Sequence, residues 1–255
     1  MLPAERHARI EDTLKSARIV STEELIRVLN VSGETIRRDL KTLERAGVLV
    51  RVHGGAVSAN STFGGEEAPF VERSGTGHEA KAAIGRAAAG LVRSRQTLII
   101  DVGTTAVEVA RALPEDFRGT VATCSLLVAA ELAGRSEVEV LLSGGRVRAG
   151  DLACSNAQAI AFFADLRADI AFLGSGGVDA EAGLTDFHLD EVAVRRVILA
   201  NSVRSYALAD ATKFGRVAPH RVCDLDAIDG LVTDARPSPA LEHAVERSGG
   251  VIVSA

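Results

Sequence analysis

The spacing of hydrophobic residues divides the chain into two regions with different patterns. Over the first sixty residues the apolar side chains recur every three or four positions, as in Ile10 and Leu14, which is typical of amphipathic helices. From about residue 80 onward, short uninterrupted apolar runs alternate with helical stretches, which indicates an α/β domain. We therefore predict a small N-terminal domain followed by a larger α/β domain.

Three short helices are predicted in the N-terminal region. The first covers about residues 4–16, and the second covers about 22–30, following Ser21 as its N-cap. The third begins after Ser32, another favourable N-cap, and ends near Gly47, because glycine commonly follows the last turn of a helix. The residues predicted to be buried in the second and third helices are Leu25, Val28, Leu29, Ile36, Leu40 and Leu43.

The second and third helices are joined by a three-residue turn, which predicts a helix-turn-helix. Because the apolar stripe of the third helix faces the core, its opposite face is expected to be exposed. That face carries Arg38, which can pair bidentately with guanine, and Lys41, which can reach a phosphate. On this helix we predict DNA contacts from Ser32, Thr35, Arg37, Arg38, Lys41 and Thr42.

The stretch after the third helix predicts a β-hairpin. Its apolar and polar residues alternate, and Gly54 and Gly55 favour a tight turn with positive φ. A hairpin in this position is the wing of a winged helix-turn-helix. Arg51 and His53 share one face of it with Leu49, and we predict that they contact a phosphate backbone or the minor groove.

The residues of this region resemble a known family signature. The stretch VSGETIRRDLKTLERAGVLVRVHGGAV is similar to the N-terminal signature of the DeoR family of bacterial transcription regulators, and the similarity covers residues 5–57 almost continuously. In that family a winged helix-turn-helix reads operator DNA. The resemblance therefore implies double-stranded operator DNA as a partner.

A region rich in glycine, serine and threonine follows the predicted wing. Residues 58–79 show no hydrophobic period, and we predict a linker there. The domain boundaries that result are a DNA-binding domain over residues 1–57 and an effector-sensing α/β domain over residues 80–255.

The large domain is predicted to contain a largely parallel sheet, because its strands are continuously apolar and alternate with helices. Ligands bind such sheets at the carboxyl ends of the strands. The strands are predicted at 97–101, 120–124, in EVEVLLSGG, in DIAFLGSGG (169–177), at 205–210, in DGLVTD and in VIVS, and the helices around Ile84 and at 104–113, 125–134, 156–166, 187–201 and 238–247.

Four strand-end loops of this domain carry polar and glycine residues. In the first, Gly103 makes a turn after a strand, and Thr104 and Thr105 open a helix whose free N–H groups favour phosphate. The other three are SGGRVRAG (143–150), GSGGVDAEAGLTDFHLDE (174–191) and ADATKFGR (209–216). Together they predict a polar site for a small phosphorylated polyol.

This domain also resembles the effector domain of the DeoR family, over about residues 79–235, which is similar to ribose-5-phosphate isomerase. The resemblance implies phosphate binding by Gly103, Thr104 and Thr105, and polar roles for Asp179, Glu191 and Lys213. Cys124 and Ser155 depart from the family pattern. The full set of predicted effector-binding residues is Asp101, Gly103, Thr104, Thr105, Gly144, Gly145, Arg148, Asp179, Glu191 and Lys213.

Composition narrows the function classes. The 255-residue chain has a formal net charge of −5, whereas its first 57 residues carry a small excess of basic residues, which favours a nucleic-acid partner for that segment. Its three cysteines are far apart, so neither a disulfide framework nor a zinc site is expected, and no cofactor is predicted. The opening segment is charged, and no apolar run is long enough for a membrane span. We expect a cytoplasmic protein.

The combined features predict a transcription regulator, usually a repressor in this family, that is released from its operator by a phosphorylated sugar. A homo-oligomer, either a dimer or a tetramer, is expected, because one small winged helix buries too little surface for tight DNA binding. Two alternatives remain at this point. One is a sugar-phosphate isomerase or deaminase with an additional N-terminal domain, and the other is a DNA-binding regulator whose sensor pocket has degenerated.

Overall fold

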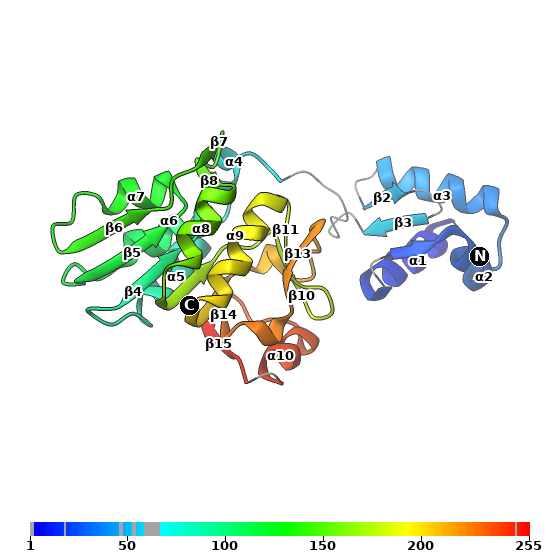
Figure 1. Cartoon of the computed structure of the whole chain (residues 1–255). Coiled ribbons are helices and arrows are strands. Elements are labelled where there is room, and N and C mark those ends of the chain that lie inside the picture. Colours follow the sequence, from blue (N-terminus) through cyan, green and yellow to red (C-terminus); the bar gives the residue numbers. More distant parts are fainter. Residues whose placement is uncertain (1–2, 18, 46–47, 53–54, 59–66, 248) are drawn as a thin grey trace. The chain divides into compact units, whose positions relative to one another are not determined.

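The fold is taken from a computed structural model of the whole chain, which describes all residues except 1–2, 18, 46–47, 53–54, 59–66 and 248. The chain forms two compact units, Met1–Gly65 and Glu66–Ala255, and each is described by itself (Figure 1). In the described part of the chain, no helix combines the length and the hydrophobicity that crossing a membrane requires.

The N-terminal unit packs three helices against a small antiparallel sheet. The helices are α1 (Pro3–Ala17), α2 (Thr22–Leu29) and α3 (Gly33–Arg45), close to the predicted ranges. The sheet has the order β1-β3-β2 and consists of β1 (Ile19–Ser21), β2 (Leu49–Val52) and β3 (Gly55–Ser58). Strands β2 and β3 form the predicted hairpin, whereas β1 was not predicted.

The core of this unit follows the helical spacing with one exception. Leu25, Ile36 and Leu40 are at most 2% exposed, and the backbone N–H of Glu24 donates to Ser21 Oγ as predicted for the cap. The prediction that Val28 is buried is wrong, because its side chain is 54% exposed. Val28 lies one position, or 100°, around the helix from the buried Leu29, which turns it away from the core.

Two further features hold the N-terminal unit together. The carboxylate of Asp39, on α3, is buried and accepts hydrogen bonds from the Arg6 guanidinium and His7, both on α1. Gly55 lies so close to β1 that a Cβ there would sit 2.2 Å from the Val20 carbonyl oxygen. Gly55 is therefore required for the pairing of β3 with β1. The prediction that it adopts a positive φ is wrong, and Gly54 lies outside the described residues.

The large unit is built on a seven-stranded parallel sheet of order β15-β14-β12-β9-β4-β5-β6. The chain first winds outward from β4 to β6, and then returns to the other side of β4 and continues through β9 to β15. The strands are β4 (Thr97–Ile100), β5 (Gly119–Thr123), β6 (Val138–Leu142), β9 (Ala168–Leu173), β12 (Ser202–Leu208), β14 (Gly230–Thr233) and β15 (Val251–Ser254).

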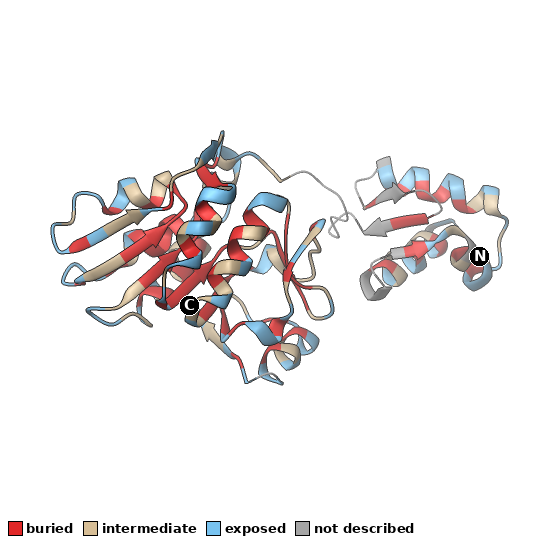
Figure 2. Cartoon of the chain, in the orientation of Figure 1, coloured by how far each residue is buried: buried red, intermediate tan, exposed pale blue. Residues whose placement is uncertain are grey.

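Helices cover both faces of this sheet, and Figure 2 shows buried residues concentrated on the strands between them. The helices are α5 (His78–Ala89), α6 (Thr104–Ala112), α7 (Leu126–Leu132), α8 (Ala157–Ala164), α9 (Leu189–Ala200) and α10 (Pro239–Glu246). The sheet separates two hydrophobic cores: Leu98 and Ile100 of β4 pack with α5–α7, whereas Ile99 packs with α8–α10. This arrangement is the predicted α/β fold.

Three small features were not predicted. A ribbon joins β7 (Arg146–Arg148) to β8 (Ala153–Ser155), and a second sheet combines β10 (Gly177–Asp179), β11 (Gly183–Asp186) and β13 (His220–Cys223). Helix α4 (Phe70–Gly75) falls within the predicted linker. This stretch is polar, and two of its side chains, Glu67 and Arg73, form ion pairs with other parts of the large unit.

Candidate functional site

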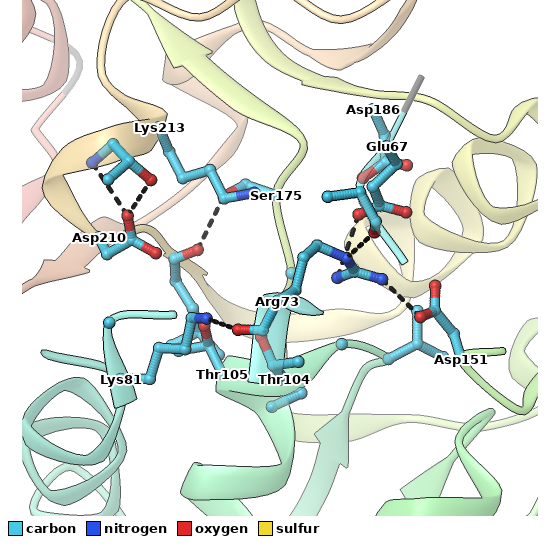
Figure 3. Close-up of a pocket in the computed structure, with 18 of the residues that line it drawn as sticks. Glu67, Arg73, Lys81, Thr104, Thr105, Asp151, Ser175, Asp186, Asp210 and Lys213 are labelled. Atoms are coloured by element: carbon cyan, nitrogen blue, oxygen red, sulfur yellow. Dashed lines mark hydrogen bonds and ion pairs between the residues drawn. The ribbon is translucent and has the colours of Figure 1, made fainter. Parts of the chain in front are cut away.

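A cavity of about 210 Å3 lies in the large unit, at the carboxyl ends of neighbouring strands β4, β9 and β12 (Figure 3). The winding direction of the sheet reverses between β4 and β9, and this reversal is where open α/β sheets usually bind ligands. Residues 102–106 follow β4, residues 174–175 follow β9, and residues 210–213 follow β12, and all three segments contribute to the cavity wall.

One end of the cavity is formed by the start of helix α6. Gly103 caps this helix with φ of 113°, a conformation that favours glycine. The first N–H groups of a helix have no intrahelical acceptor and carry a partial positive charge. Thr104 and Thr105 add hydroxyl groups beside them, and all three residues line the cavity. This end can bind an anion.

Two cations from the segment after β12 line the same cavity. Burial lowers the pKa of Lys213, and the neighbouring charge of Arg216 lowers it further. Arg216 stacks over the Phe187 ring at 4.7 Å, and its buried Nε has no hydrogen-bond partner among the described residues. Both cations would gain from an anionic ligand, because such a ligand would compensate charges that the protein leaves partly uncompensated.

A third cation at the cavity, Arg195, is already neutralised. Its side chain is 3% exposed, its Nε lies 2.5 Å from Asp101 Oδ2, and its Nη1 lies 2.7 Å from Asp186 Oδ2. Glu191 is a third carboxylate, at 3.6 Å. Burial disfavours the Arg195 charge, but the three carboxylates together raise the pKa of Arg195 well above its ordinary value. Asp101 therefore supports the cavity from beneath and is not among its lining residues.

A second ion-pair cluster continues from Glu191. Arg148 donates to Glu191, at 2.8 Å from Nε, and to Asp151. Asp151 also accepts from Arg73, and Arg73 pairs with Glu67 at 3.1 Å. Burial raises the pKa of Glu191 in spite of the two arginines beside it.

The same cluster includes the acidic and histidine side chains that could hold a metal ion. Ligand atoms of Glu67, Asp151 and His188 lie within 4.8 Å of one another. The guanidinium of Arg73 already pairs with both carboxylates, so a cation is in place. We assign no metal to this site.

Several residues predicted for the effector site lie away from the cavity wall. Asp179 accepts hydrogen bonds from the backbone N–H groups of Glu181 and Ala182, in the turn between β10 and β11. Gly144 and Gly145 form the turn before β7 with φ of 67° and 102°. Arg148 reaches the cavity only through the carboxylates that it pairs with. The cavity-lining members of the predicted set are Gly103, Thr104, Thr105, Glu191 and Lys213.

The two departures from the family pattern also lie outside the wall of this cavity. Cys124 is buried, and its Sγ donates to Asp101 at 3.5 Å. Burial, followed by the charge of Asp101, raises the pKa of the Cys124 thiol well above its ordinary value. Ser155 is buried in β8.

Sequence reasoning missed four cationic residues of the cavity, namely Arg73, Lys81, Arg195 and Arg216. Lys81 is 6% exposed, and it lies three and seven residues before Ile84 and Ala88 on the buried stripe of α5. A lysine on the apolar stripe of a helix could have been recognised from the sequence as a candidate functional residue, because lysine is seldom buried without a partner. No local pattern marks Arg195, because its partners come from the end of β4, the end of β11 and α9.

In the N-terminal unit, α3 presents the predicted polar face. Arg37, Arg38, Lys41 and Thr42 are exposed. Arg37 forms an ion pair with Glu34 at 3.2 Å, and Thr42 donates back to the Arg38 carbonyl at 3.0 Å. Arg38 and Lys41 are therefore the long cationic side chains of this face that are best placed for a partner.

The remaining predicted contacts lie at the helix start and in the wing. Ser32 accepts from the Thr35 N–H at 3.3 Å, and the two hydroxyls lie 2.9 Å apart. Arg51 lies in β2, opposite Ala56 of β3. His53 lies outside the described residues.

An exposed cationic helix in a winged helix-turn-helix unit, together with a polar cavity at the switch point of an α/β unit, defines a class of protein: a DNA-binding regulator with a ligand-sensing domain. The comparisons with known proteins agree. Residues 6–62 match the model of the DeoR-like helix-turn-helix domain, and residues 76–235 match that of the DeoR C terminal sensor domain. The chain belongs to the DeoR family of transcriptional regulators, as its sequence motifs predicted.

Relatives match along almost the whole chain. The glycerol-3-phosphate regulon repressor of Escherichia coli K12 is 34% identical, over 93% of each chain. The regulator GolR of Listeria innocua is also 34% identical, over 98% of this chain and 97% of its own. A ribose 5-phosphate isomerase from Methanocaldococcus jannaschii is a weaker structural match, with 16% identity, 55% coverage of each chain and a TM-score of 0.41. The two sequence relatives are named as a repressor and a transcriptional regulator, and the isomerase alternative is set aside on that ground.

Proposed function

We propose that this protein is a transcriptional repressor whose release from operator DNA is controlled by a small phosphorylated sugar or polyol bound in the β4–β9–β12 cavity. The observation that carries the ligand class is the pairing of charges in the cavity. Arg195 and Arg73 are held by carboxylates, whereas Lys213 and Arg216 line the same cavity as the start of α6 and form no ion pair among the described residues. A phosphate is the group that uses a helix N-terminus and two cations together.

The acidic part of the wall supports a polyhydroxylated remainder of the ligand. Asp151, Asp186 and Glu191 line the cavity, and carboxylate oxygens can accept hydrogen bonds from sugar hydroxyls. The volume of about 210 Å3 lies below the roughly 300–1,000 Å3 of pockets that hold drug-sized ligands. This size favours a sugar monophosphate over a nucleotide. One relative is named as a glycerol-3-phosphate regulon repressor, which supports the same chemical class.

For the DNA side, we propose that Arg38 reads a base edge in the major groove and that Arg51 and His53 in the wing contact the backbone. The protein would bind as a dimer or tetramer across a two-fold operator, because a single small module buries only about 600–1,000 Å2 on DNA. Since operators are chromosomal, we place the protein in the cytoplasm.

The ligand part is tested by thermal unfolding of the full-length protein with phosphorylated sugars and polyols of three to six carbons. Each compound is compared with its unphosphorylated counterpart. One of the phosphorylated compounds is expected to raise the transition temperature, as mass action requires for a ligand of the native state. That compound should also lower binding to an operator selected from random duplexes. If no compound does either, the ligand assignment is wrong and the degenerate-sensor alternative stands.

Two substitutions separate the ligand and DNA roles. Thr104→Val is expected to preserve operator binding and to lose the response to the phosphorylated compound. Arg38→Ala is expected to reduce the preference for the selected operator over a scrambled duplex, because base contacts cost about 1–3 kcal/mol each when they are lost. Equal losses on both duplexes would contradict base reading by Arg38.

A further inference from the structure

The structure suggests how ligand binding is transmitted toward the DNA-binding unit. Residues Glu67–Gly77, which we name the cover segment, contribute part of the cavity wall. They also follow directly on the stretch that leads from the N-terminal unit. The cover segment is therefore the only part of the described cavity wall that is continuous in sequence with the connection to the DNA-binding unit.

The cover segment is attached to the large unit mainly by polar contacts. Its helix α4 contains no buried residue, and Val71 is 82% exposed. Two ion pairs join it to the rest of the unit: Arg73 with Asp151 at 2.5 Å, and Glu67 with His188 at 3.3 Å. Within the segment, Arg73 also pairs with Glu67 at 3.1 Å and donates to the Ala68 carbonyl at 2.7 Å, so Arg73 links the two attachments. An attachment without an apolar core can be rearranged without unfolding the domain.

Lys81 connects this attachment to the cavity. Its Nζ donates to the Thr76 carbonyl at 2.6 Å and to the Arg73 carbonyl, as Figure 3 shows for Arg73. The ammonium group is buried, and both of these partners are neutral. Lys81 also lines the cavity beside Thr104 and Thr105, which places it next to the proposed phosphate position.

We propose that Lys81 and Arg73 form a ligand-controlled attachment of the cover segment, and that the docked segment is the form that binds operator DNA. The inference rests on the proposed function. A charge-assisted hydrogen bond to phosphate is about twice as strong as one between neutral groups, so a phosphate at α6 draws Lys81 away from the Arg73 and Thr76 carbonyls. The cover segment then detaches, and the connection to the DNA-binding unit changes.

The test uses full-length Arg73→Gln and Glu67→Gln, with Arg86→Gln, an exposed arginine on α5, as the charge-matched control. The probe is the phosphorylated compound that stabilises the wild-type protein. Three quantities are measured for each variant: the dissociation constant of that compound, the dissociation constant of the selected operator with and without it, and amide hydrogen exchange of residues 67–77.

In the wild-type protein and in Arg86→Gln, the compound should weaken operator binding by a factor between about 5 and 150 and should speed exchange in the cover segment. In Arg73→Gln and Glu67→Gln, the compound should bind more tightly than in wild type, by up to the same factor, because binding no longer has to detach the segment. Operator binding should already be weak without it, and the ratio of the two operator constants should fall to about one. Exchange in the cover segment should be fast from the start.

Two outcomes would overturn the proposal. The first is a wild-type ratio of operator constants in both variants, which would mean that the cover segment does not transmit the signal. The second is loss of compound binding in both variants, which would make Arg73 and Glu67 ligand contacts. Failure of every phosphorylated compound to stabilise the wild-type protein is a different result, because it rejects the proposed ligand before the cover segment is tested.

Discussion

Replacing Arg195 by methionine tests whether the buried ion cluster holds the sensor domain together. Methionine keeps most of the length and apolar volume of the side chain but removes the charge. The substitution leaves Asp101, Asp186 and Glu191 buried without their shared cation, at side-chain exposures of 2%, 5% and 7%. Breaking a buried pair in this way costs about 3–5 kcal/mol. With a slope of about 2 kcal/mol per molar, we expect the urea midpoint to fall by about 2 M.

The pH dependence of this cost has a definite sign. In the native protein, burial opposes ionisation of Asp186, but Arg195 and two backbone N–H groups hold the pKa of Asp186 below its usual value. Without Arg195, burial dominates at Asp186 and raises the pKa of Glu191 further. A carboxylate whose pKa is raised by folding destabilises the folded state increasingly as the pH rises from the unfolded-state pKa, about 4, through the raised value. The difference between variant and wild type should therefore be largest near pH 7.5 and smaller near pH 5.

The assay is urea unfolding followed by far-ultraviolet circular dichroism at both pH values. Arg167→Met, at an exposed position after α8, is the control and should shift the midpoint little. Arg195 does not hold the domain together as predicted if Arg195→Met costs less than about 1 kcal/mol at pH 7.5, or if its cost does not decrease at pH 5.

Three other predictions follow from individual contacts. Lys213→Met should weaken the stabilising phosphorylated compound about 10- to 100-fold in a calorimetric titration, because it removes a charged hydrogen-bond donor, while operator binding stays intact. Gly85→Ala should lower the free energy of unfolding of the sensor domain in urea by more than about 1 kcal/mol, since its Cβ would lie 2.5 Å from the Glu108 carbonyl. Gly75→Ala, with open space around it, is the control. A stabilised Gly85→Ala would show that helix propensity outweighs packing. Burial opposes ionisation of Asp39, but bonds from its α1 partners lower its pKa, so thermal stability of the N-terminal unit should fall as the pH drops below about 4. Asp39→Asn should flatten that dependence, and an unchanged pH profile would exclude the carboxylate as its source.

The sequence was informative wherever a local period or a strand-end motif determined the structure. The parallel strands were predictable because their residues are apolar on both faces, and the position of Gly103, Thr104 and Thr105 at one cavity end followed from a strand, a turn and a helix start in succession. Val28 was assigned to the core incorrectly because the helical spacing does not define where the apolar face of a helix ends. The packing of the neighbouring elements decides which residue at the margin of that face is buried.

The charge partners were not predictable in the same way. Asp101 was expected to face the ligand, but it pairs with Arg195, which lies 94 positions later in the chain. The pairing depends on the crossover that places β4 beside β9 and packs α9 below their carboxyl ends. A residue type and its local motif do not reveal which cations remain uncompensated after folding. That information, which selects Lys213 and Arg216 over Arg195, exists only in the folded chain.

The two ion clusters differ in a way that suits a regulator. Arg195 is enclosed by three carboxylates and 3% exposed, so moving it would cost several kcal/mol. Arg73 is 15% exposed and sits on a helix with no buried residue, and Lys81 is held there by neutral carbonyls. An allosteric ligand supplies only about 1–3 kcal/mol of coupling. This coupling free energy can rearrange the cover segment but cannot break the Arg195 cluster. The Arg195 cluster therefore keeps the base of the cavity, and the ligand on it, in a fixed position while the cover segment moves.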